Sequence, residues 1–433
     1  MKPQWDAKSL REAGISLIDC DHRTPPPVAN GSGYPYIAIP QLKEGRIDLS
    51  DVRRISAEDF RDWTRKAKPQ EDDVILSRRC NPGETAHVPA GLDCALGQNL
   101  VLLRSDGTKV FPPFLRWLVR SPQWWEQVNT FINVGAVFDS LKCVDIPNFK
   151  LPLPSLADQK AIAAVLGALD DKIELNRRMN TTLEAMARAL FQSWFVNFDP
   201  VRAKLDGRQP TGLDPATAAL FPTHFEHTEN GLVPLGWRHT AIEEICAINA
   251  STLGKNDKLE TLEYIEISEV SRGNIANIAT YARGEEPSRA RRRLRHGDTI
   301  LSTVRPDRGS YFLALTPPKN RVASTGFAVL SPTKIPWSFI YAAMTQPEVS
   351  DYLGQMADGG AYPAVRPDVI GAMQVALPNE SKILEAFHRA CAPLFEEAEA
   401  NRSESRTLAT LRATLLPKLL NGEVPIPTAV CST

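Results

Sequence analysis

Two long segments of the chain carry apolar residues at the spacing of a coiled coil. The first seam advances by alternating steps of four and three residues through Ile162, Leu166, Leu169, Ile173, Asn176, Asn180, Leu183, Ala187 and Leu190. Adding 225 to these numbers gives a weaker seam in the same phase, at Phe387, Cys391, Leu394, Ala398, Asn401, Ser405, Leu408, Arg412 and Leu415. Such steps are typical of helices that pack on each other. We therefore predict two paired helices, with two unrelated amphipathic helices as the alternative.

Polar residues sharpen this prediction at two places. Ser155 and Asp158 have the spacing of a capping box, where a helix begins. Asn176 coincides with Asn401 at the shift of 225. A polar residue within an apolar seam sets the register of a coiled coil. We predict this role for Asn176 and Asn401.

Short apolar runs in the segments 1–154 and 235–378 predict strands. The runs include YPYIAIP, DDVILS, NLVLLR, LEYIEIS and GFAVLS. Turn residues separate them, and few helical stretches intervene. This pattern predicts an α+β fold in which each segment has a mainly antiparallel, curved sheet.

The two segments also repeat each other. At the shift of 225, Asp73, Ile75, Leu76 and Ser77 recur as Asp298, Ile300, Leu301 and Ser302, and Gly135-Ala136 recurs as Gly360-Ala361. At a shift of 224, Leu153-Pro154 recurs as Leu377-Pro378. Several identities in one order at nearly one offset predict an internal repeat with pseudo-twofold symmetry.

Together these patterns predict six parts. They are a globular domain at 1–154, a helix at 155–198, an irregular linker at 199–234, a second globular domain at 235–378, a second helix at 379–424 and a tail at 425–433. A helix of about 40 residues is about 60 Å long, whereas B-DNA repeats every ~34 Å. Two similar but non-identical readers on such a spacer suit an asymmetric, divided DNA sequence. A protein ligand with two epitopes would also fit.

Charge and cysteine content narrow the function. The chain has 50 Lys and Arg against 51 Asp and Glu, so DNA binding would have to come from local basic patches. The seven cysteines form no C-x-x-C pair, which argues against a zinc site or a disulfide framework. The N-terminus lacks the apolar core of a signal peptide, and no apolar run reaches the roughly 20 residues of a membrane helix. We expect a cytoplasmic protein.

Four stretches carry a family resemblance: LPLPSLADQKAIAAVLGALDDKIELNRRMN, LEAMARALFQSWFVNFDPVRAK, GLVPLGW and LRATLLPKLLNGEV. With the repeat, they make the chain resemble the specificity subunit of a type I restriction-modification system over nearly its whole length. The resemblance implies two target recognition domains, and two conserved helices in an antiparallel coiled coil that spaces the half-sites and docks partner subunits. The implied partners are double-stranded DNA with a bipartite site and two modification (methyltransferase) subunits, with restriction subunits as a further partner.

The resemblance also implies that this chain has no catalytic activity, metal or cofactor of its own. S-adenosylmethionine would be used by the modification subunits, and ATP and magnesium by the restriction subunits. The sequence agrees, since it contains neither a G-x-x-x-x-G-K-[ST] phosphate loop nor an Asn/Asp-Pro-Pro-aromatic run. The competing hypotheses are a coiled-coil scaffold or adaptor without DNA specificity, and a stand-alone nuclease or methyltransferase.

Candidate DNA contacts are side chains that can reach base edges or phosphates. Loops after the repeated strand supply Arg78, Arg79 and Asn81 in the first half, and Thr303, Arg305 and Arg308 in the second. The Gly-Ala segments supply Ser140 and Lys142, and Tyr362 and Arg366. Residues ahead of the next strand supply Gln98 and Asn99, and Ser324 and Thr325. Each group could instead be a solvated turn or a strand cap.

Two further segments are candidates. Five arginines lie within residues 289–295, and we predict phosphate contacts from Arg291 and Arg293. A loop with Asp19, His22 and Arg23, ahead of a rigid Pro-rich run, could enter a groove. Charge runs are more often solvated faces, which is the alternative for both segments.

Overall fold

Two units make up the described part of the chain. The computed structural model describes residues 5–20, 23–28, 31–135, 137–229, 231–254, 257–360 and 362–424. The first unit contains the described residues up to Lys172 and those from Thr407 onward, and the second unit runs from Ile173 to Arg406. The predicted tail at 425–433, the candidate His22, and Ala136 and Ala361 of the two Gly-Ala pairs lie outside the described residues.

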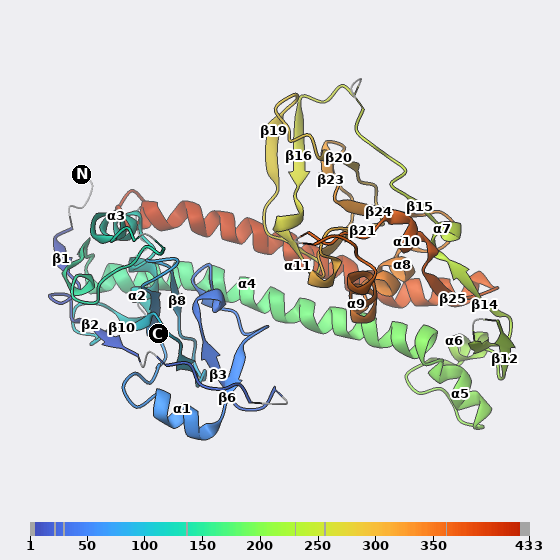
Figure 1. Ribbon diagram of the computed structural model, residues 1–433, viewed down its shortest axis with the longest axis horizontal. Helices are drawn as coiled ribbons and strands as arrows, with labels where there is room; N and C mark the ends of the chain where they lie inside the picture. The colour runs from blue at the N-terminus through green and yellow to red at the C-terminus, as the bar shows by residue number, and fades with distance from the viewer. Residues whose placement is uncertain are drawn as a thin grey trace. The chain divides into compact units, whose positions relative to one another are not determined.

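The largest sheet of the first unit is antiparallel and four-stranded (Figure 1). Its strands, in order across the sheet, are β2 (Ile15–Asp19), β10 (Leu100–Ser105), β7 (Val74–Ser77) and β8 (Thr85–His87). Side chains along β7 alternate between two buried cores, with Leu76 in one and Ile75 in the other. A strand that is covered on both faces has no polar side, which explains the unbroken apolar runs in its sequence.

Smaller sheets and short helices complete the first unit. They are the three-stranded sheet β6 (Arg53–Ile55), β3 (Tyr34–Ile37) and β9 (Ala95–Leu96), the hairpin of β4 (Leu42–Lys43) and β5 (Arg46–Ile47), the pair β1 (Ala7–Ser9) and β11 (Lys150–Pro152), and helices α1 (Ala57–Trp63), α2 (Pro112–Leu118) and α3 (Pro122–Phe131). Strands β3 and β9 are parallel, and the other named pairs are antiparallel. Ser56 and Ser121 cap α1 and α3 by accepting hydrogen bonds from backbone N–H groups of their first turns.

The second unit has a four-stranded antiparallel sheet with the same succession of strands along the chain. The strands, in order across the sheet, are β15 (Cys246–Ile248), β24 (Phe327–Pro332), β21 (Asp298–Ser302) and β22 (Tyr311–Ala314). The buried carboxylate at the start of β21 accepts a hydrogen bond from Arg295 N (2.7 Å), as Asp73 ahead of β7 does from Gln70 N (2.8 Å). These aspartates close the turn that leads into each strand, which accounts for their recurrence in the sequence.

A mixed four-stranded sheet and two antiparallel strand pairs also belong to the second unit. They are the sheet β19 (Ala279–Ala282), β16 (Thr261–Ile265), β23 (Arg321–Ser324) and β20 (Ala290–Arg293), the pair β14 (Trp237–Ala241) and β25 (Gln374–Pro378), and the hairpin of β17 (Val270–Ser271) and β18 (Asn274–Ile275). Strands β16 and β23 are parallel, as β3 and β9 are in the first unit. The helices are α7 (Ile242–Ile245), α8 (Trp337–Met344), α9 (Pro347–Gln355) and α10 (Pro367–Ala372).

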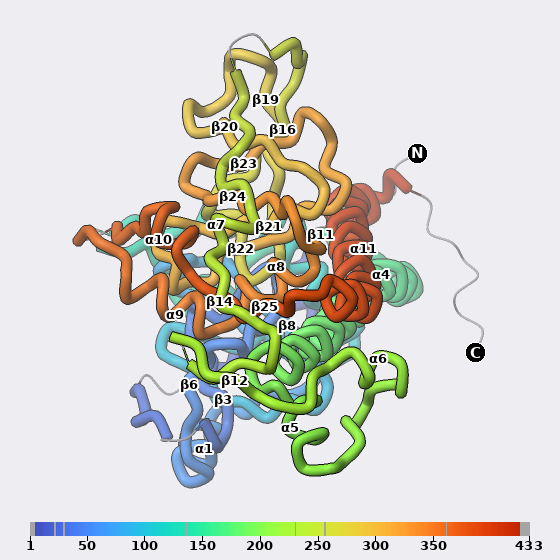
Figure 2. The backbone as a smooth tube through the Cα atoms, turned by 90° about the vertical axis from the view of Figure 1, so that its right-hand side faces the viewer, coloured from blue at the N-terminus to red at the C-terminus, as the bar shows by residue number. Residues whose placement is uncertain are grey.

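Residues 199–234 are more regular than the sequence predicts. They form α5 (Asp199–Leu205), α6 (Pro215–Leu220) and a hairpin of β12 (Phe225–Thr228) and β13 (Gly231–Pro234). Pro200 and Pro215 occupy the first turns of the two helices, and Asp214 caps α6. Each element is too short to show a period in the sequence. In Figures 1 and 2, α5 and α6 lie at the end of the second unit opposite to β16 and β19.

The two longest helices, α4 (Leu156–Phe191) and α11 (Ser381–Leu420), contribute to both units. All eighteen seam positions predicted from the sequence are buried or half-buried. In the first unit, Ile162 and Leu166 share a core with Leu419 and Leu420. The Ser155 hydroxyl accepts a hydrogen bond from Asp158 N (3.2 Å), as the capping prediction requires.

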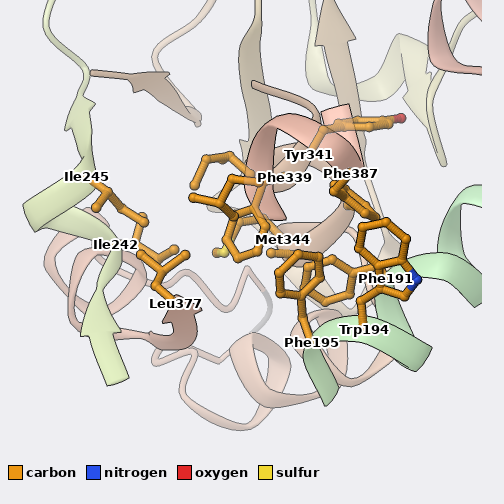
Figure 3. Close-up of a cluster of buried hydrophobic side chains, with 14 of the residues drawn as sticks. Phe191, Trp194, Phe195, Ile242, Ile245, Phe339, Tyr341, Met344, Leu377 and Phe387 are labelled. Atoms are coloured by element: carbon orange, nitrogen blue, oxygen red, sulfur yellow. The ribbon is translucent and has the colours of Figure 1, made fainter. Parts of the chain in front are cut away.

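Aromatic side chains from several elements form the core of the second unit. Figure 3 shows Phe191, Trp194 and Phe195 directed toward Phe339 of α8 and Phe387 of α11. Ring centroids of Phe195 lie 4.9 Å from Phe339 and 5.1 Å from Phe387, in edge-to-face geometry. A short π-helical stretch, Gln192–Val196, carries two of these rings into the cluster.

Candidate nucleic-acid interface

Backbone hydrogen bonds join two predicted contact regions of the first unit. Leu141 N donates to Arg78 O (2.9 Å), and Arg79 forms an antiparallel bridge with Ser140. Arg79, Asn81 and Lys142 are exposed, and the side chain of Arg78 is half-buried. The loop after β7 and the segment around Ser140 therefore form one polar surface.

The third predicted region joins the same surface. Arg78 N donates to Asn99 O (2.9 Å), and Asn99 adopts a left-handed backbone conformation (φ 67°) in the turn ahead of β10. Gln98 beside it is exposed. The structure thus brings together three groups that lie up to about sixty residues apart in the chain. We call this the first loop surface: Arg78, Arg79, Asn81, Gln98, Asn99, Ser140 and Lys142.

The second unit builds a corresponding surface with the same backbone contacts. Val365 N donates to Thr303 O (2.8 Å), and Thr303 N donates to Gly326 O (2.9 Å). The guanidinium carbon of Arg305 lies 4.5 Å from the centre of the Tyr362 ring, in cation–π contact. Arg308 and Arg366 are exposed, and Arg366 lies 3.4 Å from a carboxylate oxygen of Asp368.

Two candidates in the second unit lie below the surface. Thr303 is 8% exposed and its hydroxyl donates to Gly326 O (2.8 Å), while Ser324 is 1% exposed and its hydroxyl accepts from Gly326 N (3.3 Å). Both hydroxyls stabilise the turn between β23 and β24, and their burial argues against direct contact with DNA. Thr325, the next residue along the chain, is exposed.

The arginine run does not form a strip of unpaired positive charge. Arg291 lies 3.1 Å from a carboxylate oxygen of Glu286, and Arg293 lies 2.7 Å from one of Asp257. Arg283 also pairs with Glu286. These carboxylates partly neutralise the two arginines that the sequence predicts as phosphate contacts.

The N-terminal loop is held against α1. Arg23 lies 4.9 Å from the centre of the Trp63 ring, and its backbone carbonyl accepts hydrogen bonds from Trp63 Nε1 (3.0 Å) and the Tyr36 hydroxyl (3.3 Å). Asp19 ends strand β2.

The seam asparagines meet in the second unit. Asn176 Nδ2 donates to Glu404 Oε2 (2.7 Å) and to Asn401 O (3.3 Å). Asn401 Nδ2 donates to Asn180 Oδ1 (3.0 Å), and Asn180 Nδ2 donates to Ala398 O (3.0 Å). As the residue number along α4 increases from 176 to 180, the residue numbers of the partners on α11 decrease. The two helices therefore run in opposite directions in this stretch.

A buried ion pair that the seam pattern concealed lies in the first unit. Asp170 pairs with Arg412 and lies 3.0 Å from Arg46. Burial alone would raise the pKa of this carboxyl, but Arg412 and Arg46 outweigh burial and hold the pKa of Asp170 below its ordinary value. Sequence reasoning placed Arg412 in the seam but did not identify its partner, because the spacing of one helix says nothing of what faces it.

Sequence reasoning also missed exposed apolar side chains beside the first loop surface, among them Val134, Val137 and Phe138. Two valines and a phenylalanine near a glycine could have indicated an exposed apolar turn. Only the polar residues of this segment were considered as candidate contacts.

No cluster of three or more His, Cys, Asp or Glu side chains in the described ranges could hold a metal ion. Within the same ranges, no helix combines the length and the apolar character needed to cross a membrane.

Comparisons with known proteins agree with this arrangement. Residues 22–185 match the family model described as type I restriction modification DNA specificity domain. The chain is 24% identical to the type I restriction enzyme HindI specificity subunit of Haemophilus influenzae, over 87% of this chain and 90% of the relative. It is 22% identical to the MjaIX specificity subunit of Methanocaldococcus jannaschii, over 98% and 94% of the two chains.

The fold also matches a solved structure. It is similar to the crystal structure of the type I restriction-modification S subunit from M. genitalium, with a TM-score of 0.57 and 15% sequence identity. The match covers 97% of this chain and 99% of that chain. This likeness shows a shared fold. The match of residues 22–185 to the DNA specificity domain, and the similarity to two named specificity subunits over most of the chain, support a DNA specificity subunit of a type I restriction-modification system.

Proposed function

We propose that this chain is the subunit that gives a type I restriction-modification complex its DNA sequence specificity. Each unit would read one half of a bipartite, asymmetric target through its loops. The observation that carries this proposal is the recurrence of one loop scaffold, in which Leu141 binds Arg78 in the first unit and Val365 binds Thr303 in the second. Different side chains on one scaffold suit the reading of two different half-sites.

We further propose that α4 and α11 form an antiparallel coiled coil, that the two globular domains are related by a pseudo-twofold repeat, and that the coil sets the distance between the half-sites. The buried seam and the asparagine contacts support the coiled coil, and the shared strand order supports the repeat. The exposed faces of the helices would dock two modification subunits. In this proposal the chain binds no cofactor, and the partner subunits use S-adenosylmethionine, ATP and magnesium.

The proposal is tested by a methylome. Long-read sequencing would compare cells that express this chain and its modification subunit with cells that lack only this chain. We expect a bipartite, asymmetric methylated motif with an unread gap, present only with this chain. If a soluble complex forms and no motif depends on this chain, the function proposed here is wrong and the scaffold hypothesis replaces it.

A further inference from the structure

A turn in the first unit exposes three apolar side chains together. Val134 is 84% exposed, Val137 75% and Phe138 59%. They lie between Asn133 and Ser140, which form an isolated antiparallel bridge with backbone hydrogen bonds of 2.8 and 3.0 Å. Single exposed apolar residues are common, but a group of three on one turn marks an interaction surface. We call Val134, Val137 and Phe138 the apolar tip.

The surroundings of the apolar tip favour DNA over protein as its partner. Ser140 also forms a second bridge, with Arg79, and exposed Lys142 follows Ser140 by two residues. Asn81 is exposed on the adjoining loop, and Asp139 is the one exposed acid within the turn. Cations beside the tip would bind phosphates and so carry the tip toward the bases.

We propose that the apolar tip enters the major groove of the half-site read by the first unit and recognises 5-methyl groups of thymine. This inference rests on the proposed function and names a chemical group that the first unit reads. The major groove admits a two-stranded β-ribbon. The turn is narrow, since a Cβ at Gly135 would lie 2.3 Å from the carbonyl oxygen of Phe138.

The chemistry of the tip selects the methyl group. Valine and phenylalanine side chains have no hydrogen-bond donor or acceptor, so they cannot read the amino, carbonyl or ring-nitrogen edges of bases. The thymine 5-methyl group is the apolar group that base pairs present in the major groove. The corresponding turn of the second unit differs, because its exposed Tyr362 has a hydroxyl and its ring contacts Arg305.

The test removes the methyl group alone. In the assembled complex with the modification subunits, thymines of the first half-site are replaced one at a time by deoxyuridine, and Kd is measured. We expect binding about fourfold weaker for at least one replacement, the loss expected for one buried methyl-sized group. The triple variant Val134→Ser, Val137→Ser, Phe138→Ser should bind thymine and deoxyuridine DNA equally. All three side chains are exposed, so the variant should fold and assemble.

Leu49→Ser is the matched control, because it removes an exposed aliphatic side chain of the same unit outside the tip. It should retain the preference for thymine. The inference is overturned if the wild type binds both DNAs equally, if the triple variant keeps the preference, or if the first half-site contains only G·C pairs. A complex with a clear motif and no thymine preference would overturn this inference alone, whereas absence of any motif would also overturn the proposed function.

Discussion

Corresponding loop positions of the two units combine a shared backbone with different side chains. The carbonyls of Arg78 and Thr303 accept equivalent hydrogen bonds from Leu141 and Val365. Arg78 is a half-buried member of the first loop surface, whereas the Thr303 hydroxyl donates a hydrogen bond inward to Gly326 O. Because the backbone supplies the scaffold, side chains on it can vary without loss of the fold. This division suits a surface whose task is to recognise a particular sequence.

At the residue scale, Arg79→Ala should weaken DNA binding by the complex and reduce its dependence on salt. Arg79 is exposed at the bridge to Ser140, where a guanidinium can reach a phosphate. Loss of one phosphate contact lowers the slope of log K against log salt by about 0.9. The measurement is Kd at several salt concentrations. Arg208→Ala is the control, since Arg208 is exposed in residues 199–234 and paired with Asp206. Equal slopes for Arg79→Ala and the wild type would show that Arg79 contacts no phosphate.

At the scale of the element, the long helices combine an apolar seam with buried polar groups. The asparagine contacts between α4 and α11 hold one alignment of the two helices, since each amide has a defined partner. Asn176 Oδ1 is nevertheless buried without a hydrogen-bond partner. An unpaired buried acceptor costs about 1–3 kcal/mol. If Asn176 sets the register, as we propose, the seam gives up stability at the position that specifies register.

Asn176→Leu should stabilise the helix pair and loosen its alignment. Leucine removes the unpaired amide oxygen and allows shifted packings that the amide contacts exclude. We expect a higher Tm together with a methylated motif whose unread gap becomes longer or more variable. Thr181→Leu, on an exposed face of α4, is the control. A motif with an unchanged gap would show that Asn176 does not set the register of the two helices.

The ion pair of Asp170 and Arg412 gives a prediction with a defined pH window. The folded-state pKa of Asp170 lies below its ordinary value of 3.8, so its contribution to stability is complete above that value and is lost as pH falls through the folded-state pKa. Asp170→Asn should lower the free energy of unfolding by about 3 kcal/mol at pH 7, because it leaves Arg412 and Arg46 without a buried counter-charge.

Urea denaturation at pH 7 and below pH 4 measures this effect, with exposed Asp171→Asn as the control. The difference between Asp170→Asn and the wild type should shrink at the lower pH. A difference that is independent of pH would mean that shape, and not charge, accounts for the role of Asp170.

At the scale of the whole molecule, each unit contains its own sheets, cores and loop surface. The loop surface of either unit is built from contacts within that unit. Reading of one half-site should therefore be separable from reading of the other.

Exchange of residues 1–154 for the corresponding segment of another specificity subunit should change one half of the methylated motif. The other half should persist, because residues 235–378 are unaltered, and the gap should persist, because both helices remain. Methylome sequencing of cells with the exchanged chain measures all three features. A change in both halves would contradict separable reading.

The sequence by itself determined the elements whose signals are local or periodic. The seam positions, the Ser155 cap and the recurring buried strands β7 and β21 followed from spacing, since burial on one face or on both imposes a pattern on the chain. The resemblance to specificity subunits followed from motifs.

Only the tertiary structure decided which polar side chains remain exposed. Ser324 lies in a turn that buries its hydroxyl, and Arg291 and Arg293 face carboxylates from other segments. It likewise paired Asp170 with Arg412 and placed the apolar tip beside Arg79. These outcomes depend on contacts between segments far apart in the chain, and a linear pattern does not specify which segments come to face one another.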